Sequence, residues 1–107
     1  MYSQEEEKKM KYVLKDGKEV NLVVNYNNLF KFQREYKYAK DLVPIVMQKG
    51  SADLESIIQI VYVGYMGGNN PDPIMSYEEF LNNIDFNLAR DLNIFSELVS
   101  NRANEKN

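Results

Sequence analysis

The chain has 107 residues, enough for one small domain, and it contains no cysteine and no histidine. Disulfides, thiolate or imidazole metal sites, cysteine nucleophiles and histidine bases are therefore excluded. The net charge of −3 is unevenly divided, because residues 1–50 carry ten Lys or Arg and seven Asp or Glu, whereas residues 51–107 carry three and nine. In an oligomer, this division favours head-to-tail contacts between copies.

A β-hairpin is predicted near the N-terminus. Residues 1–9 are polar and charged, so we expect them to be disordered rather than a secretory signal. Two runs of β-forming residues, Met10–Leu14 and Glu19–Val24, flank the sequence Lys-Asp-Gly-Lys, and Asp-Gly is a strong hairpin signal. Because a lone hairpin is marginal in water, its apolar side chains should pack on helices or extend a sheet across a subunit boundary; these are Tyr12, Leu14, Val20 and Leu22.

A helix is predicted over Asn25–Lys40. Its apolar face, which should contact a central helix, contains Leu29, Phe32, Tyr36 and Ala39. The opposite side is basic with interleaved aromatic residues and contains Phe30, Lys31, Arg34, Lys37 and Tyr38. The next tract, Asp41–Lys49, contains Pro44 and predicts a short helix or turn that ends at Gly50.

The stretch Ser51–Met66 is the longest that is both apolar and helix-periodic, and it predicts a central helix over about residues 52–66. Its apolar arc spans roughly 200°, whereas a surface helix needs ~100°, so other elements should cover it from two sides. Ser51 is the expected N-cap and Gly67-Gly68 the expected stop. A narrow polar sector contains Glu55, Ser56 and Gln59, with Val63 and Met66 on or beside it.

Two further helices are predicted after the loop Gly-Gly-Asn-Asn-Pro-Asp-Pro, which we expect to be flexible. Ser76 and Glu79 have the spacing of a capping box and begin a short helix. Asp85 is the expected N-cap of the last helix. The apolar stripe of that helix contains Leu88, Leu92, Phe95 and Val99, and leaves Ile94 and Leu98 outside it.

Together these elements predict a mainly α fold with a short N-terminal β-hairpin, of the α+β class, packed around the central helix. A single domain should cover residues 10–101, followed by a frayed C-terminus at residues 102–107. Four apolar residues fall outside the predicted stripes: Val63, Met66, Ile94 and Leu98. They either extend the core or form a docking surface, and in the second case they are the candidate partner-binding residues.

Carboxylate pairs are the remaining option for catalysis, and neither available pair suits it. Glu78 and Glu79 are adjacent and so point about 100° apart on a helix, and Asp85 and Asp91 do not share a helical face. The glycine pair lacks the Lys-Ser/Thr of a phosphate loop, and no calcium-loop series is present. We therefore expect a non-enzymatic protein without metal or cofactor. With no run of about 18 apolar residues, it should be cytoplasmic and not in a membrane.

Three segments of the sequence resemble one known family: DGKEVNLVVNYNNLFKF at residues 16–32, IIQIVYVGYMGG at residues 57–68 and SYEEFLNNID at residues 76–85. With a hairpin before a mainly helical remainder, the chain resembles the tail assembly chaperones of long-tailed bacteriophages. The resemblance implies a small cytoplasmic, self-associating protein that binds the tape measure protein or other tail proteins and keeps them soluble during tail assembly. The tract 36–50 is longer than the helix-to-helix connection expected of this family.

Two other functions remain open. The protein can be a general interaction or regulatory module of a phage or its bacterial host. Alternatively, Lys31, Arg34 and Lys37 can bind nucleic acid by pairing with phosphates while the neighbouring aromatic rings stack on bases. We do not expect nucleic-acid binding, because the isoelectric point is about 5.0 and no nucleic-acid-binding motif accompanies the basic face.

Overall fold

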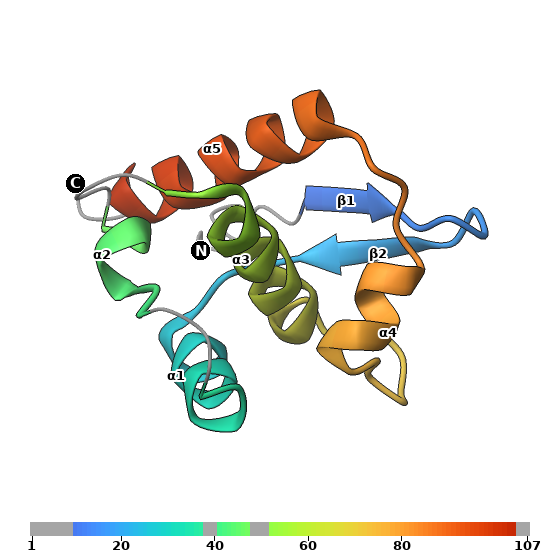
Figure 1. Ribbon diagram of the computed structural model, residues 1–107, viewed down its shortest axis with the longest axis horizontal. Coiled ribbons are helices and arrows are strands. Elements are labelled where there is room, and N and C mark those ends of the chain that lie inside the picture. The colour runs from blue at the N-terminus through green and yellow to red at the C-terminus, as the bar shows by residue number, and fades with distance from the viewer. Residues whose placement is uncertain (1–9, 38–40, 48–51, 105–107) are drawn as a thin grey trace, which may run out of the picture.

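The computed structural model describes residues 10–37, 41–47 and 52–104 of the chain. The elements are β1 (Met10–Val13), β2 (Glu19–Leu22), α1 (Tyr26–Glu35), α2 (Val43–Val46), α3 (Leu54–Gly67), α4 (Tyr77–Asn82) and α5 (Leu88–Asn104). Figure 1 shows α3 in the middle of the molecule, with α1 and α4 on opposite sides of it and α5 running past it. The predicted α+β fold, mainly α with an N-terminal hairpin, is confirmed.

The hairpin forms where the sequence predicts it. β1 and β2 pair antiparallel, with Tyr12 opposite Val20 and Met10 opposite Leu22. At the turn, Gly17 has a φ of +92°, a conformation that favours glycine, and the Gly17 N–H donates to the Leu14 carbonyl. One apolar face of the hairpin is buried against the helices, and its side chains are Tyr12, Leu14, Val20 and Leu22.

α3 is the central helix, as predicted, and it contacts α1, α4, α5 and β2. Because these elements cover most of α3 between Ile57 and Tyr65, part of its polar sector is buried: Ser56 and Gln59 are among the most buried side chains. The N-cap is Asp53, whose carboxylate accepts the Ser56 N–H at 2.9 Å. The predicted cap, Ser51, lies outside the described residues.

The C-terminal half of α3 lies against the backbone of β2 and the residue that follows it. Directly after β2, the Val23 N–H donates to the Gly64 carbonyl of α3 at 2.9 Å. A Cβ atom at Gly67 would overlap the Val23 carbonyl oxygen, and one at Gly68 would overlap the Asn21 carbonyl oxygen. Glycine is therefore needed here because the two backbones are too close for a side chain.

The loop after α3 is bonded to the domain near both of its ends, whereas residues 71–74 between them are exposed. The Asn70 side chain pairs with the outer edge of β2: its oxygen accepts the Asn21 N–H at 2.7 Å and its amide donates to the Asn21 carbonyl at 2.9 Å. Two tyrosine hydroxyls hold the far end, because Tyr62 donates to the Met75 carbonyl at 2.7 Å and Tyr65 accepts the Met75 N–H at 2.8 Å.

α1 is shorter than predicted, because it ends at Glu35 and the Tyr36 N–H closes the last turn on the Phe32 carbonyl at 2.8 Å. Leu29 and Phe32 are buried, Tyr36 is half-buried, and Ala39 lies outside the described residues. The tract that follows forms α2, a single helical turn with Pro44 at its start, as the sequence indicates.

The capping box of α4 is confirmed, since the Glu79 N–H donates to the Ser76 hydroxyl and the Ser76 N–H donates to the Glu79 carboxylate. The predicted stripe of α5 is correct for Val99 but wrong for Leu88 and Leu92. Leu88 and Leu92 are exposed, Phe95 is half-buried, and the buried side chains are Asp91, Ile94, Leu98 and Val99. Relative to the prediction, α5 is rotated about its axis so that Asp91 is the first residue of its buried face. Asn87, not Asp85, caps the first turn, and its side chain accepts the Arg90 N–H at 3.1 Å.

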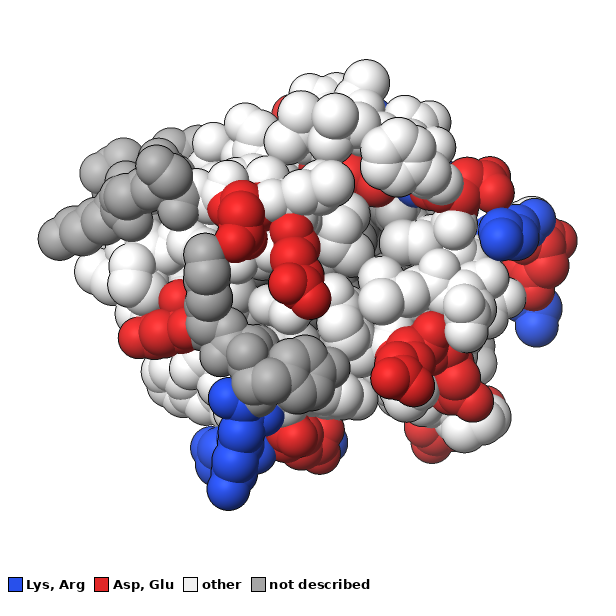
Figure 2. Space-filling view, viewed as in Figure 1, with Lys and Arg blue, Asp and Glu red and all other residues white. Residues whose placement is uncertain are grey.

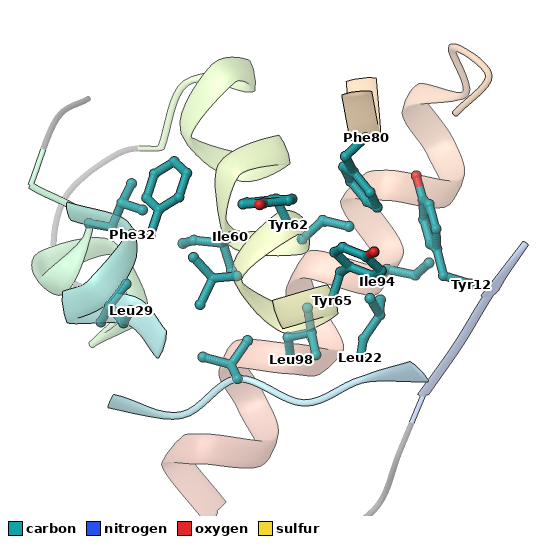
Figure 3. Packing of buried hydrophobic residues seen from close by; sticks show 14 of the residues in the cluster. Tyr12, Leu22, Leu29, Phe32, Ile60, Tyr62, Tyr65, Phe80, Ile94 and Leu98 are labelled. Atoms are coloured by element: carbon teal, nitrogen blue, oxygen red, sulfur yellow. The ribbon is translucent and has the colours of Figure 1, made fainter. Parts of the chain in front are cut away.

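Aromatic rings fill the space between the elements around α3. Figure 3 shows Phe32 from α1, Tyr62 and Tyr65 from α3, Phe80 from α4 and Tyr12 from β1 in one layer. Tyr65 stacks on Phe80 with centroids 5.2 Å apart, and Tyr12 stacks on the other side of the cluster at 6.1 Å from Phe80. Such contacts add about 0.5–1.5 kcal/mol each to the burial of the rings.

A comparison of two glycine substitutions tests the close contact between α3 and β2. Gly68→Ala should lower the free energy of unfolding by about 2–3 kcal/mol, because its methyl group meets a backbone oxygen that cannot move alone. Gly64→Ala is the control: its Cβ lies 3.3 Å from the Leu22 side chain, and the helix propensity of alanine offsets the crowding by about 1 kcal/mol. Urea denaturation measures both, and equal losses would contradict the contact.

Candidate partner-binding surface

The structure places most of the predicted docking residues in the core. Val63 is fully buried, and Ile94 and Leu98 are buried beneath α5. Met66 is half-buried and packs against the same core. Of the two alternatives left open by the sequence, Val63, Ile94 and Leu98 therefore follow the first and extend the core, because α5 turns Ile94 and Leu98 inward and the cover over α3 encloses Val63.

An apolar groove lies elsewhere on the surface, and we call it the Phe86 groove. It lies between the start of α3, α4 and the segment that joins α4 to α5, and it has a volume of about 200 Å³. Its lining residues are Leu54, Ile58, Leu81, Ile84, Asp85, Phe86, Leu88 and Asp91. Phe86 is 85% exposed, an unusual state for a large aromatic side chain in a folded domain.

Acidic side chains surround this groove. Glu55 follows Leu54 at the start of α3, and Asp85 precedes Phe86, and both carboxylates are exposed. Between residues 52 and 100 the sequence contains eight Asp or Glu and a single cation, Arg90. Figure 2 shows acidic side chains around uncharged surface near α3 and α4, with a basic cluster over α1. The groove is therefore an apolar surface in a negative field.

A buried ionic network holds the wall of the groove that carries Phe86. Asp91 is 3% exposed, and its carboxylate accepts the Tyr12 hydroxyl at 2.7 Å and the Arg90 Nε–H at 3.0 Å. The same guanidinium donates to the Asp85 carbonyl at 2.8 Å and to the Tyr12 hydroxyl oxygen at 2.9 Å. Asp91 and Arg90 at the start of α5 therefore join the hairpin, through Tyr12, to the α4–α5 connection, through the Asp85 carbonyl.

Burial and the nearby Asp91 carboxylate raise the pKa of the Tyr12 hydroxyl well above its usual value, so Tyr12 remains a donor throughout the physiological range. The Arg90 guanidinium also lies 4.6 Å from the centroid of the Tyr12 ring. The Asp91 carboxylate is thus engaged by Tyr12 and Arg90, whereas Asp85 is exposed. Among residues 10–37, 41–47 and 52–104, no group of three acidic side chains lies close enough to hold a metal ion.

The basic face of α1 is exposed, as the sequence predicts. Lys31, Arg34 and Lys37 point away from the core, and Tyr38 lies outside the described residues. Two aromatic rings accompany these cations: Tyr26 is 52% exposed and Phe30 is 43% exposed, and their centroids lie 6.0 Å apart in a stacked arrangement. The face therefore combines positive charge with a flat aromatic surface.

A second pocket, of about 310 Å³, lies between the hairpin turn and the loop after α3. Its walls carry charges of both signs, from Asp16, Lys18, Glu19 and Asp72, together with Pro71 and Pro73. Because the charges are exposed and mixed, this pocket has neither the apolar lining nor the uniform field of the Phe86 groove.

The sequence contained one signal for the groove. Phe86 stands between Asp85 and Asn87, outside every predicted helical stripe, and a large aromatic residue in a polar connection has no core to join. Leu54 and Leu88 gave no such signal, because both fit the apolar periodicity of their helices. Their exposure follows from how α3 and α5 are rotated, which depends on Asp91 and on the packing of the hairpin.

Comparisons with models of known protein families, with curated protein sequences and with solved structures gave no match. Among the described residues, no helix has the length and apolar character needed to cross a membrane. The candidate site is therefore defined by the geometry and charge of this chain alone.

Loss of the buried carboxylate should weaken the whole domain. Asp91→Asn should lower the free energy of unfolding by about 2 kcal/mol, because the Arg90 charge loses its partner and the Tyr12 hydroxyl loses a strong acceptor. Glu97→Gln, an exposed change on the same helix, should stay within about 0.5 kcal/mol. In urea denaturation, Tyr12→Phe combined with Asp91→Asn should cost less than the sum of the single changes. Additive losses would show that the network does not act as a unit.

Proposed function

We propose that this protein is a non-enzymatic assembly chaperone that covers an apolar helical segment of a partner protein with the Phe86 groove. The observation that carries the proposal is the exposure of Phe86 beside exposed Leu54, Leu81 and Leu88 on a rigid base. An amphipathic helix that lays its apolar face into such a groove removes both surfaces from water.

The strength of such binding suits a transient partner. Covering apolar surface contributes about 25 cal/mol per Å², and ordering of the partner and loss of its free motion offset much of this gain. A groove of about 200 Å³ holds only a few side chains, so binding should be reversible. Reversible cover is what a chaperone requires, because the partner must leave when it assembles.

The charge around the groove supports a partner whose helix carries Lys or Arg beside its apolar ridge. Asp85 lines the groove, Glu55 follows the lining residue Leu54, and the cation nearest to Asp85 in the sequence, Arg90, is already paired with Asp91. Opposite charges at the rim increase the association rate and discriminate against acidic helices more than they add to affinity.

The resemblance to tail assembly chaperones supports a specific partner. It points to the tape measure protein, a very long helical protein that is encoded beside such chaperones, and to action in the cytoplasm of the host cell. The competing proposal is a general interaction or regulatory module, which would use the same groove for a different protein. The two differ in whether a long helical virion protein is encoded next to this chain and is retained by it.

Co-expression tests the proposal. The long helical protein encoded beside this chain should be soluble when co-expressed with the wild-type protein and largely insoluble with Phe86→Arg, because the added charge meets the cations of the partner helix. Phe86 is 85% exposed, so this variant should unfold at the same urea concentration as the wild type. Lys15→Arg, in the exposed hairpin turn, is the control. Equal solubility with wild type and Phe86→Arg, or without this chain, would contradict the proposal.

A further inference from the structure

The exposed face of α1 has the chemistry that the Phe86 groove lacks. The groove offers apolar surface with carboxylates at its rim, whereas α1 offers the stacked rings of Tyr26 and Phe30 with Lys31 and Arg34 beside them. The α1 face lies on a helix packed against the core, and the groove is formed by α3, α4 and the connection before α5. The two faces complement each other in charge and in apolar character.

α1 cannot occupy the groove of its own molecule. Leu29 and Phe32 are buried and hold one face of α1 against the core, so the face with Phe30 and Arg34 points outward. Figure 1 shows α1 on the side of α3 opposite to α4, which forms one wall of the groove. A contact between the two surfaces therefore needs two molecules.

We propose that, in the absence of a partner, the Phe86 groove is occupied by the α1 face of a second copy of this chain. Such a contact joins two different surfaces, so it is heterologous, and each copy keeps one free groove or one free α1 face. Copies can therefore add head to tail into short chains, or close into a ring if the rotation between neighbours permits it.

This contact covers the Phe86 side chain, which is 85% exposed in a single copy. In the interior of such an assembly, the cations and aromatic rings of α1 from the next copy cover each groove, which suppresses non-specific association through Phe86. This proposal rests on the proposed function. A basic amphipathic helix of the partner competes with α1 of the second copy for the groove, so partner binding shortens the assembly.

Complementation between two variants tests the contact. The first variant, Lys31→Glu with Arg34→Glu, has a reversed α1 face and an intact groove; the second, Phe86→Ser, has a groove without its aromatic ring and an intact α1 face. In sedimentation velocity, wild-type protein should form concentration-dependent assemblies, and each variant alone should associate at least about tenfold more weakly. An equimolar mixture should give 1:1 dimers, because the intact groove of the first variant binds the intact α1 face of the second. These dimers should grow no further, since the two surfaces left free are both altered.

The control for charge is Lys15→Glu with Lys18→Glu, which changes the net charge by the same amount in the exposed hairpin turn. It should self-associate as the wild type does. Circular dichroism and urea denaturation should show all variants folded, because every altered side chain is exposed. Raising the salt from about 0.1 M to about 1 M shortens the screening length from ~10 Å to ~3 Å and should weaken the wild-type assembly.

Three results would overturn the inference: a wild-type protein that stays monomeric at all concentrations, variants that associate as the wild type does, or a mixture that stays monomeric. If the wild type is monomeric and binds a fluorescent single-stranded oligonucleotide, and Lys31→Glu with Arg34→Glu abolishes that binding, the α1 face instead serves nucleic acid. Self-association is measured without any partner. A negative result there would contradict this inference but not the proposed function, which the co-expression experiment tests separately.

Discussion

The close contact between the C-terminal half of α3 and β2 is the constraint on which the rest of the structure depends. Two strands of four residues are not stable alone in water, and here the helix backbone, through Gly64, Gly67 and Gly68, approaches β2 without intervening side chains. The Val23 N–H bonds directly to the Gly64 carbonyl. The hairpin is therefore positioned on α3 by backbone geometry, and its side chains reach the other helices from a fixed place.

Tyr12 connects the hairpin to the segment that forms the candidate site. Its hydroxyl meets Asp91 and Arg90 at the start of α5, and the Arg90 guanidinium in turn holds the Asp85 carbonyl. The segment before α5 is thus held at both ends, so Phe86 cannot turn inward to join the core. The exposure of Phe86 is a consequence of a network whose members lie on the hairpin and on α5, far apart in sequence.

Local patterns in the sequence were enough to predict the hairpin, the central helix, the capping box of α4 and the exposed basic face of α1, because each depends on residues within one or two turns. The rotation of α5 could not be predicted in this way. Leu88 and Leu92 fit the apolar period better than Asp91, and Asp91 is buried only because Tyr12 and Arg90 satisfy it. Of the groove residues, Leu88 is exposed by this rotation, and Phe86 was foreseeable as an outlier because its neighbours are polar. Three of the four predicted docking residues, Val63, Ile94 and Leu98, belong to the core.

The pairing of Asn70 with β2 has a consequence for aggregation. A strand with an unpaired edge can recruit strands from other chains, which is the first step toward amyloid-like growth. On β2 the side-chain amide of Asn70 occupies both the N–H and the carbonyl of Asn21, and Gly64 occupies the N–H of Val23 just beyond it. One asparagine thus takes the place of a third strand, and the small sheet is shielded on this edge from intermolecular β-pairing.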